Sequence, residues 1–130
     1  MLGNGDELPY RIHEDQGILF LVLTNGSMID TWAMKGILRE MRHHDPVAVS
    51  PVMVEQQELV RMTPEAKLLL VRVCRSIARP VAFIAYDLPD RIQGDFFARF
   101  HKPSFPFRVF DSPDRALSWF ASFTASVQVR

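Results

Sequence analysis

The sequence predicts an α/β fold in which a mostly parallel sheet is covered by helices. Two observations support this prediction. Short apolar runs recur along the chain and each is followed by a segment of helical character; the runs are ILFLVLT from Ile18, PVAVSPVMV from Pro46, PVAFIAY from Pro80 and FRVF from Phe107. These runs lack polar alternation, which is typical of strands buried on both faces, as parallel strands are. We expect a five-stranded sheet with an antiparallel edge strand, and four helices.

The amino-terminal part of the chain predicts a hairpin at the edge of the sheet. The first strand is expected over residues 10–14 and the second over residues 18–24. Gly17 can adopt the positive φ that a short hairpin loop requires. The first strand is therefore expected to be antiparallel to its neighbour.

The first helix is expected to begin after Asn25 and Gly26, with Ser27 as its cap and Asp30 near its amino end. A residue that precedes proline is pushed out of the helical region, so the helix should end near His43 and His44, before Pro46. The apolar positions at helical spacing are Trp32 or Ala33, Ile37 and Met41.

The third strand is expected over residues 47–54, and Pro51 predicts a bulge or break in it because proline cannot donate a ladder hydrogen bond. Thr63 and Pro64 form the clearest helix start in the chain, because threonine can cap the helix and proline suits its first position. This second helix should be lined on one face by Ala66, Leu70, Val73 and Ile77.

The fourth strand is expected over residues 81–86 and the fifth over residues 107–110. Between them lies a third helix that Gly94 weakens in propensity. Its inward positions are expected to be Ile92, Phe96 or Phe97, and Phe100. Asp111 or Ser112 should cap the last helix, whose inward residues are expected to be Ala116, Leu117, Phe120 and Phe123.

Length and composition predict one domain over residues 10–124, with a disordered leader over 1–9 and a flexible tail over 125–130. Fifteen basic and fifteen acidic side chains give a net charge of zero, which argues against nucleic acid as a partner. No apolar run approaches the ~18 residues of a spanning helix, so membrane insertion is not expected. The lone cysteine, Cys74, and the polar amino terminus predict a cytoplasmic protein.

The order of the expected elements resembles the STAS domain, the module of anti-sigma-factor antagonists and sulphate-transporter tails. More narrowly, the chain is similar to small stand-alone bacterial STAS-like proteins, from about Tyr10 to Ser122. The segments that carry the resemblance are PVAFIAYD leading into GDFFARF, and FRVFDSPDRALSWF. The resemblance implies a regulatory module that binds protein partners.

In the partner-switching members of that family, a serine or threonine at the start of the second helix is phosphorylated. The matching position is near Thr63, which makes Thr63 the candidate phosphoacceptor. The chain reads Arg61-Met62-Thr63-Pro64 here and lacks the aspartate and glycine of the family's motif. Helix capping is the favoured role of Thr63, because capping chemistry alone accounts for a threonine at this position.

No constellation in the chain predicts a catalytic or metal site. His43, His44 and Asp45 are of metal-ligand type, but adjacent side chains on a helix diverge, and interaction with the helix dipole is the favoured explanation. Cys74 is expected to be a buried structural thiol in mid-helix. We expect no catalytic residue, no bound metal and no cofactor.

Two further patterns are explained by folding. The aromatic and basic segment FFARFHKPSFPFRVF from Phe96 has the composition of a single-strand binder, but periodicity assigns most of its rings to the core. Pairs of carboxylates stand where loops or helix starts are expected, and caps and turns account for them. These pairs are Glu55 and Glu58, Asp87 and Asp90, and Asp111 and Asp114.

The functional hypothesis that remains is a surface. In α/β sheets, ligands and partners meet the loops at the carboxyl ends of the strands. The residues expected there are Glu55, Gln56, Gln57, Leu59, Met62, Asp87 and Asp90. We predict a non-catalytic regulatory or protein-interaction module with an unknown protein partner. The alternative is a binding domain for a small apolar or nucleotide ligand, and self-association into a homodimer is also considered.

Overall fold

The structure, a computed structural model, describes residues 8–47, 49–74, 79–100 and 105–128. Only the backbone is described at 71, 73, 74, 97, 100 and 123–128. The predicted leader therefore lies outside the described residues except for Leu8 and Pro9, and the side chain of Cys74 lies outside them as well.

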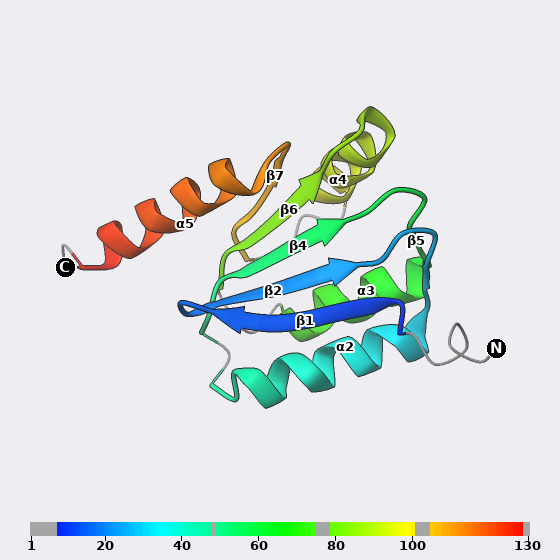
Figure 1. The fold of residues 1–130 in the computed structure, drawn as a ribbon, viewed down its shortest axis with the longest axis horizontal. Coiled ribbons are helices and arrows are strands. Elements are labelled where there is room, and N and C mark those ends of the chain that lie inside the picture. The colour runs from blue at the N-terminus through cyan, green and yellow to red at the C-terminus, as the bar shows by residue number, and fades with distance from the viewer. Residues whose placement is uncertain (1–7, 48, 75–78, 101–104, 129–130) are drawn as a thin grey trace.

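A five-stranded sheet forms the centre of the molecule, in the order β1-β2-β4-β6-β7 (Figure 1). The strands are β1 (Tyr10–Asp15), β2 (Ile18–Leu23), β4 (Val52–Gln56), β6 (Val81–Ala85) and β7 (Phe107–Phe110). β1 is antiparallel to β2, and the other three pairs are parallel. The predicted sheet and its antiparallel edge strand are confirmed.

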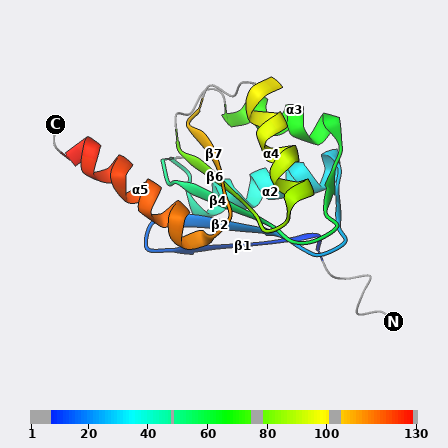
Figure 2. The ribbon, with the colours of Figure 1, turned by 90° about the horizontal axis from the view of Figure 1, so that it is seen from above.

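Four helices in the described part of the chain cover the two faces of this sheet, as predicted. They are α2 (Thr31–His44), α3 (Pro64–Cys74), α4 (Leu88–Phe100) and α5 (Pro113–Gln128). Figure 2 shows α2, α3 and α4 on one face and α5 on the other. Each parallel connection thus carries a helix, which is how parallel strands come to be buried on both faces.

The main core lies between β2, β4 and the helices α2 and α3. Leu19, Leu21 and Leu23 point from β2 toward α2, where Met34 and Ile37 meet them; all five are buried. Full burial of one such side chain stabilises the fold by about 1.5–3 kcal/mol. Leu19, Leu23 and Ile37 are fully buried in this core.

A smaller core lies on the opposite face, beneath α5. Met53, Ala82 and Ile84 pack there against Ala116 and Phe120. The helix continues past the sheet, and its carboxyl end lies well away from the strands (Figures 1 and 2). Because α5 extends to Gln128, residues 125–128 of the expected tail are helical.

The hairpin between β1 and β2 turns on Gln16 and Gly17, at φ values of 52° and 80°. Both central residues have positive φ, which matches the right-handed twist of the flanking strands. The Glu14 carboxylate accepts a hydrogen bond of 2.8 Å from the Gly17 amide. The predicted positive φ at Gly17 is confirmed.

The start of α2 differs from the expectation. Asp30, not Ser27, is the cap, and its carboxylate accepts a hydrogen bond of 2.9 Å from the Ala33 amide. Ser27 instead shares a 2.7 Å hydrogen bond with Thr24. The short strand β3 (Met28–Ile29) lies between them and pairs in parallel with β5 (Arg61–Met62). Two-residue strands have no readable period, so the sequence does not predict them.

The inward face and the end of α2 follow the prediction. Ala33 faces inward and Trp32 is exposed, while the predicted end at His44 is confirmed.

The third strand begins later than expected. β4 starts at Val52, after Pro51, and extends to Gln56. Val47 and Val49, which were expected in the strand, are exposed. Pro51 stands just before the strand, where its carbonyl still accepts a hydrogen bond of 2.9 Å from the Leu19 amide. A proline at that place costs no ladder hydrogen bond of its own strand.

The starts of α3 and α5 follow the expected chemistry. The Thr63 hydroxyl accepts a 3.1 Å hydrogen bond from the Ala66 amide, and Pro64 is the first helical residue. Ser112 lies at 3.4 Å from the Arg115 amide and occupies the corresponding place before α5. Ala66 is buried and Leu70 half-buried, whereas the side chain of Val73, Ile77 and the side chain of Phe123 lie outside the described residues. Leu117 is partly exposed rather than inward.

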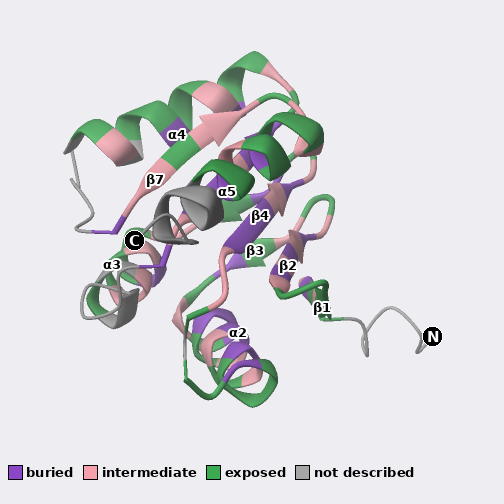
Figure 3. Ribbon diagram, turned by 90° about the vertical axis from the view of Figure 1, so that its left-hand side faces the viewer, coloured by how far each residue is buried: buried purple, intermediate pink, exposed green. Residues whose placement is uncertain are grey.

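The orientation of α4 is the main error of the sequence prediction. Ile92 was expected to point inward, as was Phe96 or Phe97, but Ile92 and Phe96 are 57% and 56% exposed. The side chains of Phe97 and of Phe100, the third expected position, lie outside the described residues. Asp90 and Gly94 face the sheet instead. A Cβ on Gly94 would lie 2.9 Å from the side chains of Phe83 and Val109, so α4 approaches the sheet through its glycine. Figure 3 shows fewer buried positions on α4 than on α2.

Candidate functional site

Three loops meet at the carboxyl ends of β2, β4 and β6. The loop after β2 is bound to the loop after β4 by backbone hydrogen bonds from Gly26 to Glu58 and from Arg61 to Ser27, each 2.9 Å. The Gln57 amide group holds them together too, because its oxygen accepts a hydrogen bond from Asn25 at 2.9 Å. The end of the sheet where partners were expected is therefore one ordered region of the fold.

Large apolar side chains are exposed on these loops and on the first turns of α2 and α4. We call this set the carboxyl-end surface; it consists of Met28, Trp32, Leu59, Tyr86 and Leu88. Singly exposed apolar residues are ordinary on protein surfaces. Here five of them lie on the loops and first helical turns that follow three neighbouring strands, which is where α/β sheets commonly meet their ligands and partners.

Leu59 is the most unusual member of this surface. Its side chain is 77% exposed, and its backbone has a φ of 63°, in the left-handed region. Residues other than glycine, asparagine and aspartate rarely adopt this conformation, which costs roughly 1–2 kcal/mol. The loop thus holds a leucine in solvent at a cost in stability. Sequence reasoning included Leu59 for its composition and had no signal for its backbone.

Glu55 and Tyr86 connect the ends of β4 and β6. The Tyr86 hydroxyl donates a hydrogen bond of 2.9 Å to the Glu55 carboxylate. Partial burial, together with this hydrogen bond and the negative charge of Glu55, raises the pKa of Tyr86 to about 12. Tyr86 was not among the residues expected at the site, because the sequence alone gives no cross-strand register.

Asp87 and Asp90 have structural roles at the start of α4. The Asp87 carboxylate accepts a hydrogen bond of 2.9 Å from the Asp90 amide and caps the helix. Asp90 is buried, and burial raises the pKa of its carboxyl, as do the negative charges of Asp87 and Glu58. The Gln56 amide offsets part of that rise. Asp90 is therefore buried at the start of α4 and offers a partner almost no contact area.

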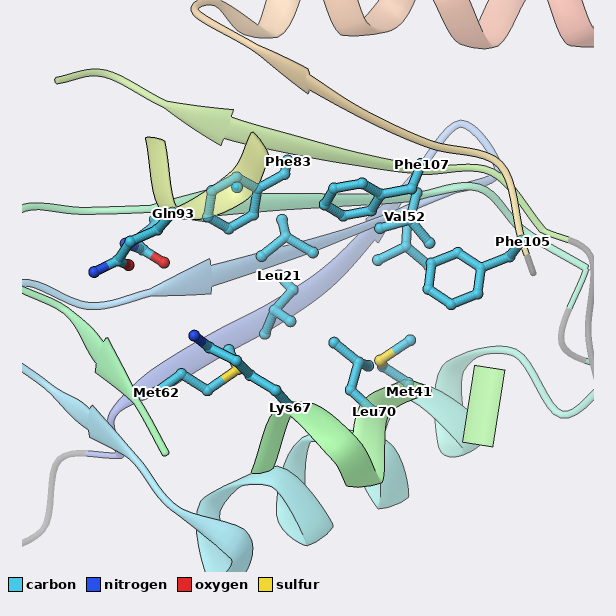
Figure 4. A pocket seen from close by; sticks show the side chains of 14 residues that line it. Leu21, Met41, Val52, Met62, Lys67, Leu70, Phe83, Gln93, Phe105 and Phe107 are labelled. Atoms are coloured by element: carbon cyan, nitrogen blue, oxygen red, sulfur yellow. The ribbon is translucent and has the colours of Figure 1, made fainter. Parts of the chain in front are cut away.

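A cavity opens on the other side of these loops, between α3 and α4 and above the sheet (Figure 4). The volume open to the centres of water-sized molecules is about 70 Å³. Its described lining is almost entirely apolar: Leu21, Met41, Val52, Val54, Met62, Leu70, Val81, Phe83, Gly94, Phe105 and Phe107, with the polar residues Gln56, Lys67 and Gln93. Small-molecule sites are commonly apolar with a few polar groups of this kind.

Two polar side chains of this cavity, Gln56 and Lys67, carry hydrogen-bond donors. Gln56 is 4% exposed, and its Nε2 makes no hydrogen bond of standard geometry with the described residues. The Gln56 side-chain amide nevertheless interacts with the Asp90 carboxyl and lowers its pKa against the larger effect of burial. Lys67 has no ion pair within the described part of the chain. Figure 4 shows the Lys67 amine and the Gln93 amide at the same end of the cavity.

The structure thus divides the predicted site residues into two groups. Leu59 is exposed on the loop after β4, whereas Gln56 and Met62 line the cavity. Gln57 is half-buried and holds the loop after β2. Thr63 is half-buried and its hydroxyl caps α3. A cavity between helices and sheet belongs to the alternative, ligand-binding prediction, but the sequence did not identify most of the residues that line it, because these depend on how closely α3 and α4 approach each other.

His43, His44 and Asp45 do not converge on one point. Both imidazoles are exposed, and His44 Nε2 lies 3.9 Å from the Glu40 carboxylate. Asp45 is buried, accepts a hydrogen bond from the Ser50 amide at 2.9 Å, and lies 3.5 Å from the Arg79 guanidinium. No group of three potential metal ligands occurs among the residues that the structure describes.

The aromatic and basic segment is mostly part of the fold. Phe105 is buried, and Phe107 packs against the main core. The Arg108 guanidinium lies 5.4 Å from the centre of the Phe110 ring and 6.0 Å from that of Trp119. The Phe110 and Trp119 rings are therefore already in contact with the Arg108 guanidinium. Only Phe96, on the outer side of α4, is exposed among the described rings of this segment.

A family model described as "Domain of unknown function (DUF7793)" matches residues 10–124. The chain belongs to this family. It is also similar to a solved structure, an uncharacterised protein of the DUF3478 family with a SpoIIAA-like fold from Shewanella loihica PV-4. The two share 12% identity and a TM-score of 0.55, over 85% of this chain and 90% of the other. At this identity the likeness shows the fold alone, which agrees with the STAS-like fold that the sequence predicts.

No curated protein matches the sequence. Among the described residues, none of the helices is both long enough and apolar enough to cross a membrane.

Proposed function

We propose that this DUF7793 domain is a non-catalytic STAS-like regulatory module of the bacterial cytoplasm that binds a protein partner through its carboxyl-end surface. The observation that carries the proposal is Leu59, an exposed leucine held at positive φ. Strained backbone of this kind clusters at functional sites. Folding gains little from an exposed side chain. The Leu59 side chain is instead explained by contact with a bound partner.

The loop that carries Leu59 supports this interpretation. The backbone amide of Gln57 donates a hydrogen bond to the Leu23 carbonyl at 3.1 Å, and the Glu58 carbonyl accepts one from the Gly26 amide. Arg61 follows in β5, paired with β3. Leu59 is thus fixed on both sides by regular backbone hydrogen bonds. A side chain presented in a fixed position loses less entropy on binding than one on a free loop.

The proposed partner contact can be tested with a photo-reactive phenylalanine analogue placed at position 59 and expressed in the source organism. The control carries the same analogue at position 117 on α5, where Leu117 is also exposed. We expect a discrete cross-linked species from position 59 that position 117 does not produce. Cross-links to a second copy of the chain would identify a homodimer as the partner. Identical products from both positions would refute the surface.

Leu59→Gly separates the cost of this loop from its function. Glycine adopts positive φ without strain, so we expect the free energy of unfolding to rise by up to about 1 kcal/mol in this variant. The same variant should lose the partner, because the leucine side chain is gone. A variant that loses stability instead would show that Leu59 belongs to the packing of the fold.

The candidate phosphoacceptor, Thr63, forms a separate part of this proposal. Phosphorylation would add about −1.5 to −2 charges at the positive end of α3, next to the loop of Leu59. It would also remove the hydroxyl from its present hydrogen bond to Ala66. Intact-mass measurement of the protein from its source organism, across growth conditions, tests this: a phosphoform absent throughout would leave Thr63 as a helix cap only.

A second candidate function is the binding of a small apolar ligand. The cavity between α3 and α4 is the observation that favours it. Native mass spectrometry of freshly purified protein tests it, because a retained small mass would identify an occupant. A co-purified polypeptide without any small mass would favour the partner-binding function alone.

A further inference from the structure

The cavity has one chemical asymmetry. Its walls are apolar, but its described polar groups include two hydrogen-bond donors, the Gln56 side-chain amide and the Lys67 ammonium group. Gln56 Nε2 is buried without a partner of standard geometry, and the Lys67 ammonium group has donors only and forms no described ion pair. An unsatisfied buried donor costs about 1–3 kcal/mol. A ligand that supplies an acceptor would remove this cost.

From these groups we propose that the cavity binds a small carboxylate with a hydrocarbon tail. The tail contacts Val54, Phe83 and Leu70, while the carboxylate lies at Lys67 and Gln56. This inference rests on the second candidate function and names its ligand class. The partner-binding proposal at Leu59 does not depend on it.

The size of the cavity limits the tail. One water-sized position needs roughly 10–15 Å³ by this measure, so about 70 Å³ holds roughly five to seven such positions. A chain of about six to eight carbons is therefore the expected size. Three residues set the shape around it: Phe83 and Phe107 from the sheet, and Leu70 from α3 (Figure 4).

The charge of the ligand follows from the lining. Lys67 is the only ionisable side chain among the described residues that line the cavity. Asp90, which contacts Gln56 electrostatically, is not one of them. An anionic head group is thus attracted by the Lys67 ammonium group and can accept a hydrogen bond from the Gln56 amide. An ammonium head group would be repelled by the charge of Lys67.

The test uses octanoate, with 1-octanol, octylamine and acetate as comparators. Binding is followed by NMR titration of methyl groups, with Val54, Val81 and Leu70 as reporters in the cavity and Leu117 as a remote control. We expect octanoate to shift the cavity methyls and to bind at least tenfold tighter than octanol. Acetate lacks the tail and octylamine has the wrong charge, so neither should saturate.

Variants separate the head group from the tail. Lys67→Met keeps the length of the side chain and removes its charge, so octanoate affinity should fall about tenfold to that of octanol, which corresponds to about 1.4 kcal/mol. Lys67→Arg should retain most of the affinity. Lys35→Met, at an exposed position on α2, is the matched control and should change nothing. Leu70→Phe should weaken octanoate and octanol alike, because it fills the cavity.

Each outcome decides one question. Equal affinity for octanoate and octanol would overturn the carboxylate class and leave an apolar ligand site. No shift of the cavity methyls with any of the four compounds at millimolar concentration would overturn the ligand site as well. Full octanoate affinity in Lys67→Met would show that the head group lies elsewhere.

Discussion

The helices α2 and α4 cover the same face of the sheet in opposite ways. α2 buries Ala33, Met34, Ile37 and Met41 against β1 and β2 and leaves its charged residues in solvent. α4 instead directs Leu88, Ile92 and Phe96 outward, at a spacing of one helical turn, and approaches the sheet through Gly94. One helix is thus packed as a core helix, whereas the other leaves apolar surface outside and a cavity beside it.

This difference suggests where the fold serves stability and where it serves function. The half of the sheet beneath α2 is covered by the large buried side chains of Met34, Ile37 and Met41. The half between α3 and α4 retains an open volume, the donor groups of Gln56 and Lys67, and exposed apolar residues at the strand ends. Proteins commonly depart from local packing rules at functional sites.

The largest expected effect comes from breaking the buried ion pair at the end of α2. Arg79 and Asp45 are 5% and 7% exposed, and Arg79 Nη1 also donates to the Ser50 carbonyl at 3.2 Å. Arg79→Met leaves Asp45 buried and unpaired, so we expect a loss of about 3–5 kcal/mol in the free energy of unfolding, measured in urea. Arg115→Met breaks the exposed pair with Asp111 and should cost less than about 1 kcal/mol. Equal losses would show that the pair is not buried in solution.

The next largest effect compares one isoleucine from each helix. Ile37 is fully buried in α2, so Ile37→Ala should cost about 2–5 kcal/mol. Ile92 is exposed on α4, and Ile92→Ala should change stability by no more than about 0.5 kcal/mol. Urea unfolding of both variants measures the contrast directly. Similar losses in the two would mean that α4 turns its apolar side inward after all.

The sequence predicted the fold because apolar runs and helix starts are local signals. Thr63 and Pro64 start α3 through contacts within one turn, and Gly17 turns the hairpin through its own φ. The prediction failed for α4 because its inward side is decided by Phe83 and Val109, residues of two different strands that meet only in the folded protein. Periodicity alone cannot show that a glycine faces the sheet.

The candidate site could be predicted only in part for the same reason. The loop after β4 was identified from its position at a strand end, and Leu59 and Glu58 are exposed there. Gln56 and Met62 were placed in that loop, but β4 and β5 put them on the wall of a cavity. The partner of Tyr86 could not be predicted either, since Glu55 is reached across strands.

A smaller effect is expected from closing the gap between α4 and the sheet. In Gly94→Ala the new Cβ meets Phe83 and Val109 at 2.9 Å. Overpacking costs about 1–3 kcal/mol, and the higher helix propensity of alanine returns about 1 kcal/mol. We therefore expect a net loss of about 1 kcal/mol in urea, while Asp95→Ala, at an exposed position of the same helix, should be nearly neutral. A Gly94→Ala variant more stable than the wild type would place α4 farther from the strands.

The smallest effect concerns pH and the bond between Tyr86 and Glu55. The raised pKa means that the folded protein holds the phenolic proton more tightly than the unfolded chain, so stability should fall as the pH rises from the ordinary value near 10.0 to about 12. Burial is the first cause of the shift and remains in Glu55→Gln, so this variant should lower the pKa of Tyr86 only part of the way. Ultraviolet titration of tyrosinate in a Tyr10→Phe background isolates Tyr86, because the chain has two tyrosines. Glu58→Gln should leave the titration unchanged, and a Glu55→Gln titration that matches wild type would show that the two strand ends are not joined by this hydrogen bond.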